Sequence, residues 1–177
     1  MFIDSKTAEE QTILTVANAM CTAARTAPKA RGLDYLKTAV LTGADISSLA
    51  AEMRRMGEAQ GEKGKTFIRD AGNVEASSAV VLIGMLNKTH GLNERCCQCG
   101  FANCQSCEEA GAICVYTSLD LGIAVGSAVS LAADQRIDNR VMFTIGKAAA
   151  SLELLGELEL IMGIPLSSSG KSIYFDR

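Results

Sequence analysis

The sequence predicts an α+β fold, in which a mixed sheet of four or five strands carries helices on both faces and presents a cysteine-rich loop. Three observations predict it. Apolar runs rich in β-branched residues alternate with longer segments of helical periodicity, without a regular β-α-β repeat. The run AVVLIGML at 79–86 is apolar throughout, as expected for a strand covered on both faces. The chain has 177 residues, 48% of them hydrophobic, which suits a single domain over 1–177.

The first helix is expected to begin near Thr7 and to end before Pro28. Asp4 or Ser5 can cap it, because a short polar side chain can accept a hydrogen bond from a free backbone N–H of the first turn. Proline disfavours helical backbone at the residue before it, which sets the other end. Cys21 lies on or beside the apolar face, where cysteine behaves as a small hydrophobic residue. That face consists of residues at helical spacing: Ile13, Val16, Ala17, Met20 and Ala24.

Two strands and two helices are expected between the first helix and the cysteines. Asp45 is the expected N-cap of the first of these helices, whose apolar stripe includes Leu49 and Met53. The loop at 57–65 is rich in glycine and charge but lacks the glycine spacing of a P-loop, so no phosphate site is expected there. In chain order these elements are a strand at 35–41, helices at 46–59 and 66–76, and the strand at 79–86.

A long helix rich in small residues is expected after the cysteines. Ser118 or Asp120 would open it, and Gly122 and Gly126 would let another backbone approach closely, either within the domain or across a homodimer. The last elements are expected as a strand at 141–145, a helix at 147–155 and a strand at 158–165.

The composition indicates a cytoplasmic protein that binds neither nucleic acid nor a membrane. The formal net charge is −3, whereas nucleic-acid binding needs a basic face. The N-terminal stretch MFIDSKTAEEQT lacks the charged-then-apolar pattern of a signal peptide. No run reaches the roughly 18 apolar residues of a membrane span. In a reducing cytosol, clustered cysteines bind metal more often than they form disulfides.

Six of the seven cysteines lie within the segment CCQCGFANCQSCEEAGAIC at 96–114. Thiols at this density serve a metal, a set of disulfides or a redox relay. We therefore interpret 94–116 as a cofactor-binding loop that the rest of the fold presents.

Part of this segment has the form of a [4Fe–4S] binding loop. Its pattern is C-x2-C-G-x3-C, in which a close pair of cysteines and a third one shortly after can reach different irons of one compact cluster. Gly100 removes the Cβ that would obstruct the backbone beside the cluster, and Phe101 can shield one cluster face from water. Cys107 is an alternative to Cys114 as the fourth ligand, but it is expected to share a helical turn with Cys104. The expected ligands are Cys96, Cys99, Cys104 and Cys114.

Other uses of the thiols stay open. A structural zinc site could take the C-x2-C pairs at 96–99 and 104–107, although zinc ribbons usually separate their pairs by about 15–20 residues. A dithiol relay needs a lowered thiol pKa, for which Arg95 is the neighbouring cation. Disulfides need an oxidising compartment. His90, the single histidine, is expected at the surface or in support of a ligand rather than as a ligand.

The chain resembles a family of uncharacterised bacterial and archaeal proteins described as containing a ferredoxin domain. The resemblance starts from CxxCGFxxC, a further cysteine and DLGIA at 120–124, and extends through ARTAPKARGLD, RDAGNVEASSAVVLIG, IGKAAASLELL and MGIPLSSSGKSIYFDR. The cysteine motif alone is also similar to the cluster motif of Rnf-type electron-transport subunits and of the corrinoid iron–sulfur protein. The family implies a [4Fe–4S] site at Cys96, Cys99, Cys104 and Cys114. Cys97 and Cys107 depart from its pattern, and Cys97 could replace Cys96 through a shift of one residue.

A second resemblance is to the nitroreductases, which bind FMN at a dimer interface. It rests on the layout of an N-terminal helix followed by APKARG and of a C-terminal strand that ends in GIP. The resemblance implies that Arg25, Lys29 and Arg31 could hold the flavin phosphate. The chain departs from that family because it lacks the Arg-Arg-Ser type of start and has no tryptophan to cover a ring system.

We therefore expect an iron–sulfur protein that acts in electron transfer or redox sensing with an unidentified redox partner. The alternatives are an FMN-dependent oxidoreductase of nitroreductase-like fold and a structural zinc protein. The sequence offers no acid–base pair and no nucleophile beside a base, so no catalytic residue is assigned to an oxidoreductase activity. A homodimer is expected from the small residues of the long helix.

Overall fold

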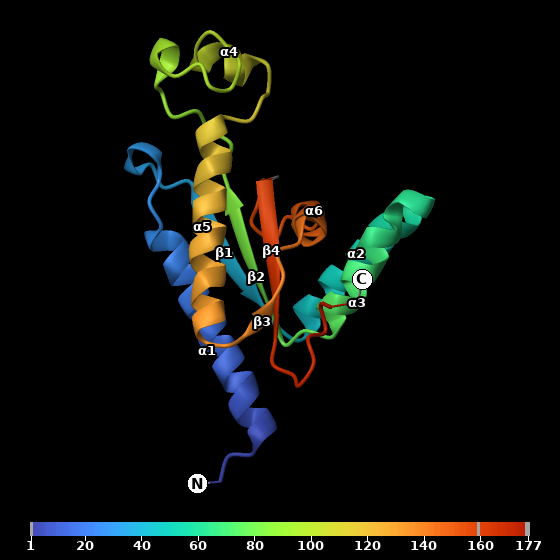
Figure 1. The fold of residues 1–177 in the computed structure, drawn as a ribbon. Helices are drawn as coiled ribbons and strands as arrows, with labels where there is room; N and C mark the ends of the chain where they lie inside the picture. The colour runs from blue at the N-terminus through green and yellow to red at the C-terminus, as the bar shows by residue number, and fades with distance from the viewer. Residues whose placement is uncertain (1, 159, 176–177) are drawn as a thin grey trace.

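A computed structural model describes residues 2–158 and 160–175 and arranges them in three layers around one sheet (Figure 1). The strand order is β1-β2-β4-β3, and every neighbouring pair is antiparallel. The strands are β1 (Leu36–Leu41), β2 (Ala79–Met85), β3 (Asp138–Asn139) and β4 (Leu160–Ser167). The helices are α1 (Ser5–Thr26), α2 (Ala44–Ala59), α3 (Lys65–Glu75), α4 (Cys104–Glu109), α5 (Val115–Asp134) and α6 (Phe143–Ser151). Short 3₁₀ turns occupy Ala30–Gly32, Gly61–Gly64 and Asn93–Arg95.

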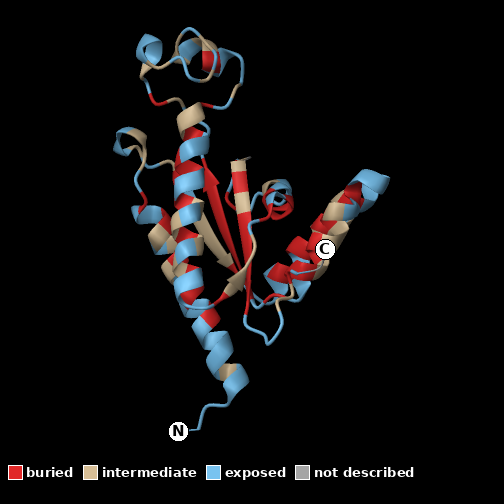
Figure 2. Cartoon of the chain, viewed as in Figure 1, coloured by how far each residue is buried: buried red, intermediate tan, exposed pale blue. Residues whose placement is uncertain are grey.

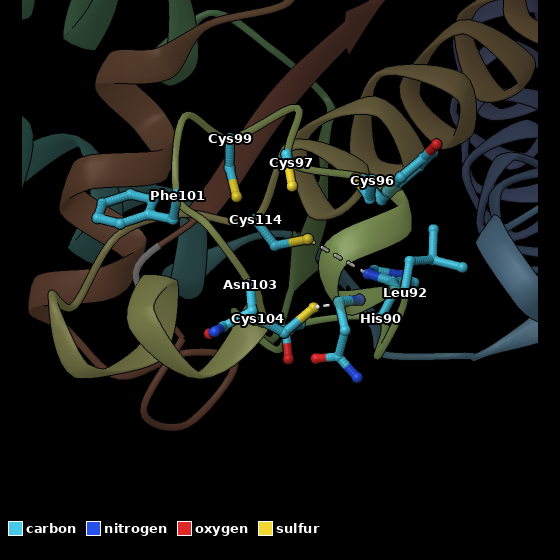
Figure 3. Close-up of a pocket in the computed structure, with 12 residues that line it drawn as sticks. His90, Leu92, Cys96, Cys97, Cys99, Phe101, Asn103, Cys104 and Cys114 are labelled. Carbon is cyan, nitrogen blue, oxygen red and sulfur yellow. Dashed lines mark hydrogen bonds between the residues drawn. The ribbon is translucent and has the colours of Figure 1, made fainter.

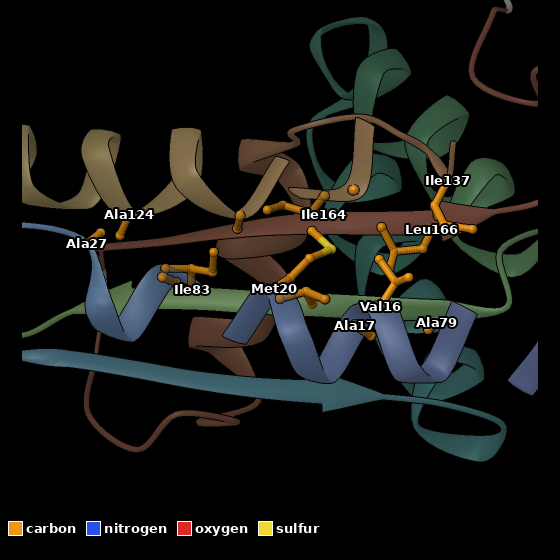
Figure 4. Packing of buried hydrophobic residues seen from close by; sticks show 14 of the residues in the cluster. Val16, Ala17, Met20, Ala27, Ala79, Ile83, Ala124, Ile137, Ile164 and Leu166 are labelled. Atoms are coloured by element: carbon orange, nitrogen blue, oxygen red, sulfur yellow. The ribbon is translucent and has the colours of Figure 1, made fainter. Parts of the chain in front are cut away.

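The central strand β2 separates two hydrophobic cores. Its residues point alternately to the two faces, so Val81 and Ile83 join the core formed with α1 and α5, whereas Val80 and Leu82 join the core formed with α2, α3 and α6. All seven β2 residues are buried, which confirms the prediction of a strand covered on both faces (Figure 2). Figure 4 shows the first core, in which α1 and α5 pack on the same side of β2 and β4.

The sheet is antiparallel throughout, whereas the sequence led us to expect a mixed sheet. A continuous apolar strand is typical of parallel sheets, because those have helices on both faces. Here helices cover both faces of an antiparallel sheet, so the same burial requires the same apolar run. The hydrophobic pattern reports burial and does not report strand direction.

Three predictions about helices and strands are wrong. The strand predicted at 141–145 is instead the start of α6, and only Met142 makes an isolated bridge, to Gly163. Its buried residues follow the helical period rather than alternation, since Thr144, Ile145, Ala148 and Ala149 all face inward. Gly43, not Asp45, occupies the N-cap position of α2, and α5 begins at Val115 rather than at Ser118 or Asp120.

The other predicted elements are confirmed within a few residues. Asp4 caps α1 as expected, because its Oδ1 accepts a hydrogen bond of 3.0 Å from the backbone N–H of Thr7. The helix predicted at 66–76 corresponds to α3 and the strand predicted at 35–41 corresponds to β1. The last strand, predicted at 158–165, corresponds to β4, with Glu159 outside the described residues.

Helix α5 is apolar on both sides. It is the one helix in the described ranges 2–158 and 160–175 whose length and composition would allow it to cross a membrane, whereas the sequence analysis found no such run. Leu121, Ala124 and Ala128 lie on its inner side and pack into the core with α1. Gly122 and Gly126 have no other part of the chain within 4 Å of an added Cβ, so the close packing within the chain uses the alanines.

We predict that Gly163→Ala destabilises the protein. A Cβ at this position would lie 1.9 Å from Cγ2 of Ile145, where α6 packs on β4. Overpacking of this kind costs about 1–3 kcal/mol of unfolding free energy, which urea denaturation followed by circular dichroism can measure.

Gly72→Ala in α3 is the matched control. Nothing lies within 4 Å of its added Cβ, and alanine in place of glycine inside a helix gains about 0.5–1 kcal/mol. Equal effects of the two substitutions would contradict the close contact between α6 and β4.

Candidate metal centre

The cysteine-rich segment stands beyond one end of the sandwich, between the end of β2 and the start of α5 (Figure 1). Cys104 and Cys107 share the first turn of α4, as expected. Asn103 caps this helix, because its Oδ1 accepts a hydrogen bond of 2.9 Å from the backbone N–H of Ser106. The segment therefore has its own local structure outside the two hydrophobic cores.

Hydrogen bonds between the residues that follow β2 and the residues at or just before the start of α5 join the two ends of the segment. The Asn87 amide donates to the carbonyl of Ala112 at 3.1 Å, and its oxygen accepts from the backbone N–H of Cys114 at 3.3 Å. The hydroxyl of Thr117 donates to the carbonyl of Lys88 at 3.0 Å, so the first turn of α5 is fixed to the same strand end. These bonds hold Cys114 beside the chain that enters the loop.

Five of the clustered cysteines line one pocket. Figure 3 shows the sulfur atoms of Cys97, Cys99, Cys104 and Cys114 on the inner side of the loop. All seven cysteines are free thiols, so these donors are available to a metal. The residues that line this pocket are Thr89, His90, Leu92, Asn93, Cys96, Cys97, Cys99, Phe101, Asn103, Cys104, Cys114 and Tyr116. All four predicted ligands, Cys96, Cys99, Cys104 and Cys114, are among them.

Cys107 lies next to this group but does not line the pocket. Its side chain is fully buried, and its sulfur lies 3.7 Å from the carbonyl oxygen of Ala112. Burial, together with the neighbouring thiols of Cys99, Cys114 and Cys104, raises the pKa of the Cys107 thiol to about 11. Cys107 is therefore held as a neutral thiol among its neighbours when no metal is bound.

The hydrogen bonds at the sulfur atoms distinguish possible ligands from Cys97. The sulfur of Cys104 accepts from the backbone N–H of Asn93 at 3.3 Å, as a thiolate ligand can. The sulfur of Cys97 instead lies 3.4 Å and 3.3 Å from the carbonyl oxygens of Glu94 and Ala102, to which only a protonated thiol can donate. This difference favours the ligand register that excludes Cys97.

His90 is buried rather than at the surface. Its Nδ1 lies 3.6 Å from the sulfur of Cys114 and its Nε2 lies 3.2 Å from Oδ2 of Asp120. Both ring nitrogens therefore have partners inside the protein, which suits support of a ligand rather than direct metal binding. The sequence analysis missed Asp120 as a site residue, although a carboxylate inside the apolar helix sequence LDLGIAVG is a signal that a buried partner exists.

The structure brings Arg25 and Lys29 together beside the carboxylate of Asp34, the Lys29 ammonium lying 3.9 Å from Oδ1, whereas Arg31 contacts His90. Arg25 pairs with Asp34, with Nη1 and Oδ2 at 2.6 Å. The Lys29 ammonium donates to the carbonyls at the end of α1, including that of Arg25 at 2.6 Å. Arg31 donates to the carbonyl of His90 at 2.5 Å, and so contacts the loop that leads from β2 to the cysteine segment.

The donor set fits an iron–sulfur cluster. A [4Fe–4S] cluster takes thiolate ligands that reach different irons, so its ligands surround a space rather than meet at one atom. Five cysteines that line one pocket supply the ligand type and number that such a cluster takes. Within residues 2–158 and 160–175, no three His, Cys, Asp or Glu side chains are placed to hold one metal ion.

Two sequence comparisons concern the family of the chain. A family model described as "uncharacterized protein containing a ferredoxin domain" matches residues 110–177. A curated protein of Archaeoglobus fulgidus, itself described as an uncharacterized protein, is 39% identical over 186 residues, which cover 100% of this chain and 98% of that protein.

The solved structures similar to this chain include several nitroreductases. Nitroreductase A from Vibrio parahaemolyticus has a TM-score of 0.56 at 10% identity, over 97% of this chain and 61% of that one. The nitroreductase CinD from Lactococcus lactis has a TM-score of 0.55 at 16% identity, over 99% and 86% of the two chains. A putative nitroreductase from Desulfovibrio desulfuricans, solved in complex with FMN, has a TM-score of 0.55 at 16% identity, over 90% and 80%. The nitroreductase-like fold is therefore confirmed, and the chain spans about three fifths of the Vibrio enzyme.

We predict that Cys107 resists alkylation in the metal-free protein. A thiol whose pKa is raised from 9.0 to about 11 has a thiolate fraction near pH 8 that is lower by roughly 100-fold, and only the thiolate reacts with iodoacetamide. The exposed Cys97 should be modified first in a time course followed by peptide mass spectrometry. Both should react alike in urea, and equal rates in the folded protein would contradict the burial of Cys107.

Proposed function

The chain belongs to the family of uncharacterised proteins that contain a ferredoxin domain, and from this premise we propose that it binds a [4Fe–4S] cluster and transfers single electrons. The observation that carries the proposal is the set of five free thiols that line one pocket at the end of the sandwich. Thiolates are the ligands that iron–sulfur clusters take, and a bound cluster of this kind accepts and releases one electron at a time.

The proposed ligands are Cys96, Cys99, Cys104 and Cys114. Three features of the chain support this set. Gly100 has φ +83°, a left-handed conformation that glycine adopts without strain, so the backbone can turn directly after Cys99. The N–H of Asn93 donates to the sulfur of Cys104, which stabilises negative charge on that ligand. Cys97 is left out because its sulfur faces carbonyl oxygens.

The remaining residues of the pocket would control access to the cluster. Phe101 and Leu92 line it with apolar surface and reduce contact with water, which changes the reduction potential of a cluster. The segment lies at one end of the fold (Figure 1), where a redox partner can approach it. Electron transfer to such a partner and redox sensing use the same site, and we propose the former as the main role.

A second candidate function is an FMN-dependent oxidoreductase. The similarity to nitroreductase structures, one of them in complex with FMN, favours it. Arg25, Lys29 and Arg31 are then the proposed cations for the flavin phosphate, and Arg25 would have to leave Asp34 to bind it. Flavin released on denaturation of the purified protein, and absent from an Arg25→Ala variant, would support this candidate.

We predict that protein purified and reconstituted without oxygen is brown and holds about four irons and four sulfides per chain. Iron, sulfide, zinc and flavin should be measured on the same sample, because each alternative has its own signature. Stoichiometric zinc in colourless protein would support a structural zinc protein and would exclude the cluster.

We predict that Cys99→Ser abolishes cluster retention, because Cys99 is a ligand in every assignment considered. Cys97→Ser should keep the iron content and the absorbance of the wild type, and Cys21→Ser, on α1 and packed against the first core, is the control for loss of a thiol elsewhere. If Cys97→Ser loses the cluster while Cys96→Ser keeps it, the ligand register is shifted by one residue.

A further inference from the structure

His90 connects the proposed cluster to the rest of the fold. Its side chain is only 1% exposed, although it belongs to a loop that leaves the sheet. One ring nitrogen, Nδ1, lies 3.6 Å from the sulfur of Cys114, and the other, Nε2, lies 3.2 Å from Asp120. The imidazole therefore bridges a proposed ligand and a buried carboxylate.

Asp120 is itself fixed by a distant part of the chain. Both of its oxygens accept the backbone N–H of Ala30, at 3.0 Å and 3.1 Å. Ala30 opens the 3₁₀ turn between α1 and β1, so the carboxylate on α5 is anchored on the neighbouring segment of the same layer. A carboxylate held from two sides cannot turn away from the imidazole without breaking these bonds.

The imidazole is also held on its ring sides and at its backbone. The rings of Tyr35 and Tyr116 lie 5.8 Å and 5.9 Å from it, centroid to centroid. The guanidinium of Arg31 donates to the His90 carbonyl at 2.5 Å. These contacts surround the ring, whose Nδ1 faces the sulfur of Cys114.

We propose that His90 is a positioning residue of the Cys114 ligand, that its Nδ1–H donates a hydrogen bond to the ligand sulfur, and that Asp120 and Ala30 hold the ring in place. The inference rests on the proposed cluster. A thiolate bound to iron can only accept a hydrogen bond, so the ring nitrogen that faces it supplies the N–H. An N–H···S bond withdraws negative charge from the sulfur and thereby favours the reduced cluster, which carries one more electron.

Two substitutions of His90 distinguish the roles of its two ring nitrogens. In His90→Asn the side-chain nitrogen is attached to Cγ and can take the place of Nδ1, so the donor to Cys114 is kept and the contact with Asp120 is lost. In His90→Gln the nitrogen takes the place of Nε2, so the contact with Asp120 is kept and the donor to sulfur is lost. Lys88→Gln is the control for loss of a nearby cation, since Lys88 is exposed and contacts the ring of Tyr35.

The test is an anaerobic redox titration of each reconstituted variant, followed by electron paramagnetic resonance of the reduced cluster. We expect His90→Gln to lower the ratio of reduced to oxidised cluster at a fixed potential about tenfold, which for one electron is about 59 mV. The ratio in His90→Asn should stay within about threefold of the wild type, and Lys88→Gln should match the wild type. A change of the resonance spectrum in His90→Gln alone would agree with a bond to a ligand sulfur.

A role of His90 in folding alone would give a different result. Both His90 variants would then lower the unfolding temperature of the metal-free protein, and their clusters would titrate as in the wild type, which overturns the inference. If His90→Gln cannot hold the cluster, retention of iron by His90→Asn supports the inference and equal loss from both variants overturns it. Wild-type protein that takes up no iron and sulfide would overturn the proposed function, whereas a loaded wild type with an unchanged His90→Gln variant would overturn only this inference.

Discussion

The crowding of thiols at one end of the sheet is the constraint on which the rest of the structure depends. The raised pKa of Cys107, about 11, reflects its burial together with the thiols crowded around it. The fold orders this loop with hydrogen bonds. Asn93 faces the sulfur of Cys104, and Asn87 fixes the backbone of Cys114. The two hydrogen bonds therefore keep the sulfur of Cys104 and the backbone of Cys114 in place.

Much of the fold could be predicted because burial leaves a strong pattern in the sequence. The uninterrupted apolar run of β2 and the capped, periodic α1 were recognised for that reason. Strand direction could not be predicted, since helices on both faces require the same apolar run in parallel and antiparallel sheets. The start of α6 was missed because the run at 141–145 consists of residues that also favour strands. The close packing of α6 on β4, which Gly146 and Gly163 permit, is not visible in that run.

The candidate site was predictable where it is local and not where it is assembled from distant segments. The spacing of Cys96, Cys99 and Cys104 is visible within nine residues of sequence. The chain from Ala30 through Asp120 to His90 joins residues 90 and 30 positions apart, and no local pattern connects them. The only indications were a single histidine and a carboxylate inside an apolar helix. Arg31 shows the same limit, because no local pattern connects it with the His90 carbonyl 59 positions away, to which it donates.

The way in which the cysteine segment is attached has a consequence for how such a protein can diversify. Asn87 binds Ala112 and Cys114, 25 and 27 positions further along, so the segment leaves and rejoins the sandwich at almost the same place. When a loop is closed at its base, changes in its length or sequence have little effect on the structure of the helices and the sheet next to it. Natural variation could therefore alter the redox properties of the loop while the sheet and its two cores stay intact, and the two parts could evolve at different speeds.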